Sequence, residues 1–264
     1  MKVQHNPKQN QILAALPAHE FRRLSAHLEL VPMPLGVSYY ESNGKLQHVY
    51  FPTTATVSLR YGMENGTFAE IAGVGNEGML GISVFMGSKA LPRQAIVRTL
   101  GFGYRLKARL LLEEFNRAET MQYLLIRYTK MLITQASQTV VCNRYHSVEQ
   151  RLSRWLLLNF EQISSNDSVI TAELLANSVG VRRETLIELL KKLHSDGIIS
   201  YYGGHISVLN PQGLENQMCE CYNAIRSELD NLPGLLLSKP LPENVRMIST
   251  ASSSVAPRVL YNVS

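Results

Sequence analysis

One stretch of the chain, residues 169–209, constrains the fold more than any other. It holds two short amphipathic patterns that are joined by a tight turn at Gly180. Two helices that are so close together predict a helix-turn-helix at about residues 171–194. Two β-type segments follow at once, separated by Gly203-Gly204, and they predict a hairpin wing at about residues 197–209. An ordinary pair of packed helices shows a similar pattern, but the hairpin favours a winged helix-turn-helix.

The second of these helices has the chemistry of a DNA-reading helix. At about 100° per residue, four leucines between Leu186 and Leu193 fall on one side, which predicts the packed face. The other side carries groups that suit a major groove, where Arg pairs with guanine, Glu accepts from cytosine and Lys holds phosphate. The residues that we expect to contact DNA are Arg182, Arg183, Glu184, Thr185, Glu188, Lys191 and Lys192.

Composition and motifs narrow the class of protein. The 264 residues, of which 45% are hydrophobic and 18% charged, are typical of a soluble chain with two cores. No segment approaches the roughly 18 apolar residues of a membrane span, and no secretion signal is visible, so we expect a cytoplasmic protein without a membrane partner. A net charge of +5 favours a polyanionic partner. Because no nucleophile elbow, phosphate loop or HExxH motif is present, we expect no catalytic residues and no enzyme activity.

The first part of the chain predicts a β-rich domain. The pattern is helical to about Val31, and short β-type runs punctuated by Gly, Pro and Asn then extend from Pro32 to about Arg105. Many short strands with turn residues between them predict a β-sandwich or jelly roll, here a roll with flanking helices over residues 1–119.

A long helical pattern without Gly or Pro follows over residues 120–147. Residues at steps of three and four along it predict a dimerisation seam with a hydrogen-bonded centre. The residues of this predicted seam are Leu124, Tyr128, Met131, Gln135, Gln138 and Cys142. The alternative interpretation is that this face of the helix packs on the β-domain. A DNA-binding domain over residues 148–231 comes next, and a Pro- and Ser-rich tail over residues 232–264 predicts disorder.

The three cysteines argue against a disulfide framework, because their number is odd. Cys142 and His146 lie four residues apart on one helical face, a spacing that suits a metal ion. Cys219 and Cys221, however, would point about 200° apart on a helix and so would not bind one ion together. We therefore expect ordinary packing of the cysteines and no metal site.

The order of β-roll, long helix and winged helix-turn-helix resembles the Crp/Fnr family of bacterial transcription regulators. The motifs that carry the resemblance are VYFP at 49–52, VGNEGMLG at 74–81, RLSRWLL at 151–157 and LLANSVGVRRETLIELLKKLHSDGIISY at 174–201. The resemblance implies an α+β protein with an N-terminal, cyclic-nucleotide-binding-like β-roll, a long dimerisation helix and a C-terminal winged helix-turn-helix. It implies a homodimeric, sequence-specific DNA-binding regulator, with a palindromic double-stranded DNA site, RNA polymerase and a small-molecule effector as partners.

Carried over by position, the resemblance places Arg183, Glu184 and Glu188 where bases are read. Glu188 stands where the cyclic-AMP receptor type has Arg, so the preferred half-site should differ from the site of that type.

The effector site departs further from the family pattern. Members that bind a cyclic nucleotide use Gly-Glu for the ribose and Arg-Ser or Arg-Thr for the phosphate, and Gly81-Ile82 and Arg93-Gln94 fall at these places. Only Arg93 matches, so the pocket is degenerate and we expect an unidentified signal. An iron-sulfur cluster usually needs four thiolates, one more than the chain has, so no cofactor is expected. Two alternatives stay open, a ligand-binding sensor with a vestigial DNA domain and an enzyme that uses the β-roll.

Overall fold

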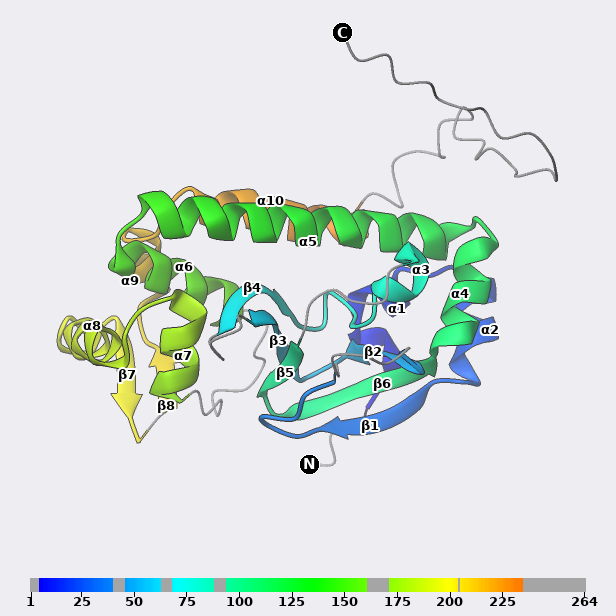
Figure 1. Ribbon diagram of the computed structural model, residues 1–264, viewed down its shortest axis with the longest axis horizontal. Coiled ribbons are helices and arrows are strands. Elements are labelled where there is room, and N and C mark those ends of the chain that lie inside the picture. Colours follow the sequence, from blue (N-terminus) through cyan, green and yellow to red (C-terminus); the bar gives the residue numbers. More distant parts are fainter. Residues whose placement is uncertain are drawn as a thin grey trace, which may run out of the picture.

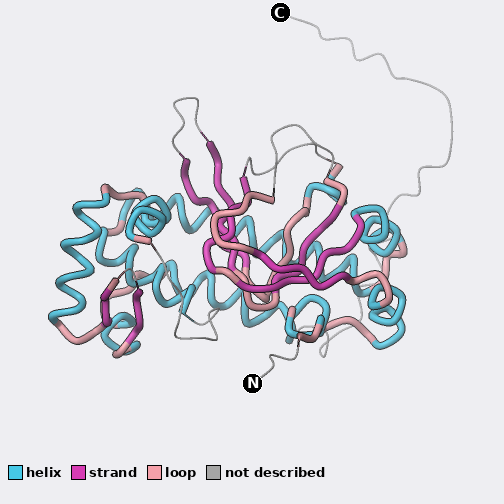
Figure 2. Tube along the Cα trace, turned by 90° about the horizontal axis from the view of Figure 1, so that it is seen from below, coloured by secondary structure: helices cyan, strands magenta, loops and turns pink. Residues whose placement is uncertain are grey.

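The computed structural model describes residues 5–39, 46–62, 68–87, 94–160, 171–203 and 205–234. A β-roll forms one end of the molecule, a long helix runs along its length, and helices with a small hairpin form the other end (Figure 1). Figure 2 shows the hairpin among the helices, apart from the strands of the roll. The predicted α+β fold, with an N-terminal roll and a C-terminal winged helix-turn-helix, is confirmed.

The β-roll consists of two three-stranded antiparallel sheets. In the first, β6 (Gly101–Lys107) lies between β1 (Glu29–Met33) and β2 (His48–Pro52). In the second, β3 (Thr56–Gly62) lies between β4 (Phe68–Val74) and β5 (Gln94–Thr99). Side chains alternate between the two faces of a strand, and the inward set, such as Val49, Phe51 and Val57, is fully buried in the core of the roll.

Short helices flank the roll. They are η1 (Pro7–Gln9), α1 (Gln11–Ala14), α2 (Ala18–Ser25), α3 (Ser83–Met86) and α4 (Ala108–Asn116). The expectation of helix to about Val31 is wrong for the last part of this segment, because α2 ends at Ser25 and β1 begins at Glu29. That strand forms by pairing with β6, with Leu30 opposite Tyr104, so its conformation depends on a partner far along the chain.

Helix α5 (Thr120–Tyr145) lies against the roll, and α10 (Cys221–Gly234) packs along it (Figure 1). The two helices run in opposite directions. Cys221, at the start of α10, lies beside His146 at the end of α5, whereas Glu228 pairs with Lys130 in the middle of α5 at 2.7 Å. Helix α10 therefore continues three residues into the tail predicted from residue 232, and residues 235–264 of that tail lie outside the described residues.

The predicted dimerisation seam on α5 is wrong in its residues. Leu124, Tyr128 and Met131 are buried in the core of the β-roll of the same chain, so the alternative interpretation of that face holds. A second apolar stripe on α5 remains exposed instead. It consists of Ile126, Ile133 and Val140, which are 53%, 61% and 70% exposed and recur every seven residues.

The C-terminal elements form a second core around three helices. They are α6 (Val148–Phe160), α7 (Ala172–Val179), α8 (Arg183–Ser195), β7 (Ile199–Tyr202), β8 (His205–Val208) and α9 (Pro211–Glu215). Among the described helices, none has both the length and the apolar character that crossing a membrane requires.

Candidate nucleic-acid interface

Local sequence explains the turn between α7 and α8. Thr171 caps the start of α7, since its hydroxyl accepts the backbone N–H of Leu174 at 3.2 Å. The helix ends at Gly180, which adopts the left-handed conformation with φ of 73° that favours glycine. Helix α8 begins three residues later at Arg183, so the turn lies where the glycine predicts it.

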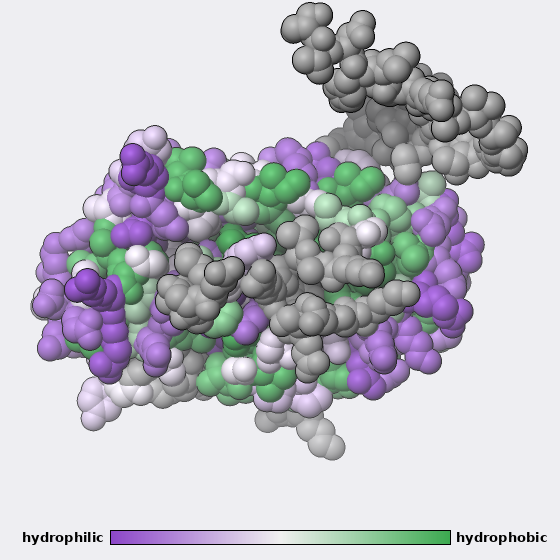
Figure 3. Space-filling model, viewed as in Figure 1, coloured by the Kyte–Doolittle hydropathy of each residue, from purple (hydrophilic) through white to green (hydrophobic). Residues whose placement is uncertain are grey.

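Helix α8 buries one side and exposes the other. Leu186, Leu190 and Leu193 are buried in one core with Trp155 of α6, whereas Leu189, at the edge of the predicted packed face, is half-buried. The structure exposes every side chain that we expect to contact DNA, namely Arg182, Arg183, Glu184, Thr185, Glu188, Lys191 and Lys192. Figure 3 shows hydrophilic side chains over the end of the molecule that α8 forms.

The exposed side of α8 offers both base-reading and phosphate-binding groups. Arg182 and Arg183 stand at the N-terminal end of the helix, together with Glu184, and Lys191 and Lys192 lie two turns further on. Guanidinium and carboxylate groups at the entering end of a helix are suited to base edges, and ammonium groups to phosphates. The arrangement therefore fits the predicted recognition helix.

The hairpin β7–β8 is attached directly to α8. The two strands pair from Ile199 opposite Val208 to Tyr202 opposite His205. The backbone N–H of Tyr201 donates to Nδ1 of His194, in the last turn of α8, at 3.3 Å. The hairpin thus stands beside the recognition helix as a wing.

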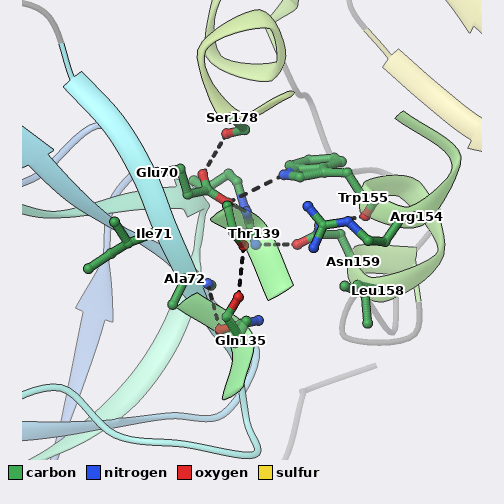
Figure 4. Close-up of a pocket in the computed structure, with 12 residues that line it drawn as sticks. Glu70, Ile71, Ala72, Gln135, Thr139, Arg154, Trp155, Leu158, Asn159 and Ser178 are labelled. Carbon is green, nitrogen blue, oxygen red and sulfur yellow. Dashed lines mark hydrogen bonds and ion pairs between the residues drawn. The ribbon is translucent and has the colours of Figure 1, made fainter. Parts of the chain in front are cut away.

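Behind this surface, a polar cluster joins the DNA-binding domain to the roll (Figure 4). At its centre is Glu70 of β4, whose carboxylate accepts from Arg98 Nη1 at 2.9 Å, Ser178 Oγ at 2.5 Å and Trp155 Nε1 at 3.4 Å. Arg98 of β5 also donates to Asn159 of α6 and lies 4.8 Å from the centroid of the Trp155 ring. Burial lowers the pKa of the Arg98 guanidinium, and the carboxylate of Glu70 opposes that shift.

This cluster, which we call the Glu70 cluster, was not predicted. Its members come from β4, β5, α6 and α7, so no local spacing relates them. A carboxylate within a strand and the single Trp of the chain were the only signals in the sequence.

The described residues of the predicted effector site, Gly81, Ile82 and Gln94, do not line the pocket at this junction. Ile82 packs against the core of the roll and offers no acceptor for a ribose. Gly81 has a φ of 108°, and a Cβ there would lie 2.8 Å from a side-chain carbon of Val49. Backbone conformation and close packing therefore account for a glycine at this position without a ligand. Gln94 begins β5, and its Oε1 is buried with no hydrogen-bond partner among the described residues. Arg93 lies outside the described residues.

The structure corrects the expectation that the cysteines lie apart. Helix α10 begins at Cys221, so Cys219 stands before the helix and the 200° separation that a continuous helix imposes does not apply. Cys142, His146, Cys219 and Cys221 come together, with their ligand atoms all within 4.8 Å of one another. Burial raises the pKa of the Cys142 thiol to about 12 and that of the Cys221 thiol to about 11.

Comparisons with known proteins agree with this architecture. Residues 150–217 match the family model of the Crp-like helix-turn-helix domain. FixK2 from Bradyrhizobium japonicum is 16% identical, with a TM-score of 0.63 over 73% of this chain and 98% of that one. A putative Crp/Fnr-family regulator from Eubacterium rectale is 14% identical, with a TM-score of 0.58 over 78% and 96%. The cyclic-di-GMP-responsive regulator CLP from Xanthomonas campestris is 17% identical, with a TM-score of 0.58 over 73% and 99%.

No curated protein matches the chain. The resemblance that the motifs indicate is nevertheless confirmed, by the domain match and by the shared fold. The chain therefore has the fold of the Crp/Fnr transcription regulators and carries a Crp-like helix-turn-helix domain at residues 150–217.

Proposed function

We propose that this protein is a homodimeric, sequence-specific DNA-binding transcription regulator without a catalytic role. One observation carries the proposal. On a Crp-like helix-turn-helix domain, α8 packs its leucines inward and exposes the whole predicted set of DNA-contacting side chains. RNA polymerase is the further partner that the family resemblance implies.

The exposed stripe on α5 supports the dimer. Ile126, Ile133 and Val140 repeat every seven residues, which is the spacing at which two helices pack knobs into holes. Burial of such a stripe against a second copy removes apolar surface from water. Two α8 helices related by a two-fold axis then require a palindromic site, with half-sites about 10 to 10.5 bp apart.

The Glu70 cluster supports a signal that acts through the β-roll. It connects β4 and β5 of the roll directly to α6 and α7, so a ligand that prefers one arrangement of this contact would shift the orientation of α8. We infer a signal other than the cyclic nucleotide of the family pattern, because the side chain of Ile82 supplies no acceptor at the position that the resemblance gives to the ribose.

The experiment that tests the proposal is a selection from random duplex DNA with the full chain at near-physiological salt. We expect a two-fold symmetric motif. Arg183→Ala should weaken binding to it by about 1–3 kcal/mol and relax one base position, since an Arg that pairs with guanine is lost. Lys191→Ala should instead weaken all sequences alike and reduce the salt slope by about 1.

A matched control is Arg22→Ala, which removes an equally exposed guanidinium from α2 of the roll domain. It should leave both affinity and base preference unchanged. If the selection yields only salt-sensitive binding without a motif, and added cell metabolites do not restore one, a sensor with a vestigial DNA domain is the better description.

A further inference from the structure

We propose that Cys142, His146, Cys219 and Cys221 bind one zinc ion, at the point where α5 ends and α10 begins. Cys142 and Cys219 lie 77 positions apart in the chain, yet the fold brings the ligand atoms of all four residues within 4.8 Å of one another. All three thiols are buried, and His146 is half-buried. The proposed zinc site does not depend on the proposed DNA-binding function, and the two are tested separately.

Two distances within the cluster match those of a tetrahedral zinc site. Zinc–sulfur bonds of about 2.3 Å in a tetrahedron place neighbouring ligand atoms about 3.5 to 3.8 Å apart. Sγ of Cys142 lies 3.6 Å from Sγ of Cys219, and Sγ of Cys221 lies 3.6 Å from Nδ1 of His146. Three thiolates and one imidazole form a ligand set that structural zinc sites use.

A second group orients the histidine as metal sites require. Nε2 of His146 lies 3.2 Å from Oε1 of Glu220, and Nδ1 faces Cys221. In the tautomer that carries its proton on Nε2, the ring would donate to this carboxylate and present the lone pair of Nδ1 to the cluster. A ligating histidine almost always has such a partner on its other nitrogen, which fixes the tautomer and the ring orientation. Ordinary packing of buried cysteines does not call for this arrangement.

The electrostatics are also suited to a zinc–thiolate centre. Zinc with three thiolates carries one net negative charge, which suits a nearby cation. Burial is the larger influence on the Cys142 and Cys221 thiols and raises their pKa, and the cation of Arg154 opposes that shift. Arg154 is 6% exposed, and its Nε has no hydrogen-bond partner among the described residues. A buried anion beside it compensates this charge.

A disulfide between Cys142 and Cys219 explains less. It would use two of the four groups and leave the pair of Cys221 and His146, with its carboxylate partner, unexplained. Zinc uses all four, and it would fasten the end of α5 and the start of α10 to each other directly beside α6.

Cobalt titration of the reduced, chelator-treated full chain tests the proposal. We expect one cobalt ion per chain, with sulfur-to-cobalt charge-transfer bands and the strong visible bands of tetrahedral coordination, and stoichiometric displacement by zinc. Glu220→Gln, at a side chain that is 80% exposed, should fold normally and weaken zinc affinity by about 10- to 100-fold. Glu215→Gln removes an exposed carboxylate on α9 and is the matched control.

Cys142→Ser should weaken the thiolate bands and the affinity for cobalt, because one of the three thiolates is lost. Because this variant replaces a buried residue and its fold is at risk, the titration of the unaltered chain and the comparison of the two Glu variants decide the matter. Absence of thiolate bands in the folded, reduced chain would overturn the proposal, as would equal zinc affinities of Glu220→Gln and Glu215→Gln. Formation of a Cys142–Cys219 disulfide in a chain that takes up no cobalt would overturn it too, in favour of a thiol pair.

Discussion

Replacing Ser178 by alanine should loosen the DNA-binding domain from the β-roll while leaving both cores intact. Ser178 of α7 donates its hydroxyl to Oε2 of Glu70 on β4 at 2.5 Å, across the boundary between the domains. In the variant, Glu70 keeps its ion pair with Arg98 at 2.9 Å and its hydrogen bond from Ser58 at 2.6 Å. No buried charge is therefore left unpaired.

The expected loss is that of one hydrogen bond to a charged group, about 1.5–3 kcal/mol. Since each 1.4 kcal/mol is a factor of ten, the population of molecules in which the two domains have separated should rise by about 10- to 150-fold. The rest of the DNA-binding domain should keep its stability, because Ser178 is half-buried and its replacement by Ala leaves no large cavity.

The exchange rate of the indole N–H of Trp155 measures this opening. Trp155 is the only Trp in the chain, is 4% exposed and donates Nε1–H to Glu70 at 3.4 Å, so its single indole resonance reports on the junction. We expect exchange in Ser178→Ala to be about 10- to 150-fold faster than in the unaltered chain. Ser153→Ala is the matched control, because the hydroxyl of Ser153 is buried in the same domain and has no hydrogen-bond partner in the part of the chain that the structure describes. Equal exchange rates in Ser178→Ala and Ser153→Ala would refute the role of the Glu70 cluster in docking.

Two further changes test other parts of the structure. Ile133→Glu should halve the mass measured by analytical ultracentrifugation, because it places a charge in the middle of the exposed stripe on α5. Leu100→Glu, at a similarly exposed apolar residue in the roll, should leave the mass unchanged. A dimer that persists in Ile133→Glu would mean that another surface forms the dimer. Burial raises the pKa of the Glu77 carboxyl above its ordinary 4.5, so the folded state binds the carboxyl proton more tightly than the unfolded state does. The free energy of unfolding therefore has its full value below pH 4.5 and falls as the pH rises through the raised pKa. Urea unfolding should therefore show Glu77→Gln gaining stability relative to the unaltered chain as pH rises, and parallel pH profiles would contradict this assignment.

The winged helix-turn-helix was predictable because its signals are local. Gly180 provides the left-handed residue that ends α7, and the leucines of α8 lie at helical spacing, so each element follows from its own few residues. The strand at Glu29–Met33 was not predictable in this way, since its pairing partner β6 begins more than sixty residues later.

The prediction of the dimerisation seam on α5 was wrong for a different reason. The helix is apolar on two faces, one with Leu124 and Met131 and the other with Ile126 and Ile133, and both repeat at helical spacing. Periodicity shows that a face is buried but not what buries it, and here the roll of the same chain covers the first face. The cysteine cluster was missed because the prediction assumed a helix through Cys219, where the chain instead turns.

The two contacts that hold the DNA-binding domain differ in strength, and the difference indicates which of them a signal can shift. Arg154, in the middle of α6, lies near the cysteine cluster, and Asn159, close to the C-terminal end of α6, joins the Glu70 cluster. A structural zinc site contributes about 10–16 kcal/mol, whereas the hydrogen bonds that cross to Glu70 contribute about 1.5–3 kcal/mol each. Allosteric coupling is typically about 1–3 kcal/mol, which is comparable to one hydrogen bond of the second contact and far smaller than the contribution of a zinc site. With zinc bound at the proposed site, the end of α5 and the start of α10 would therefore stay fastened to each other, and the Glu70 cluster is the contact whose opening would turn α8.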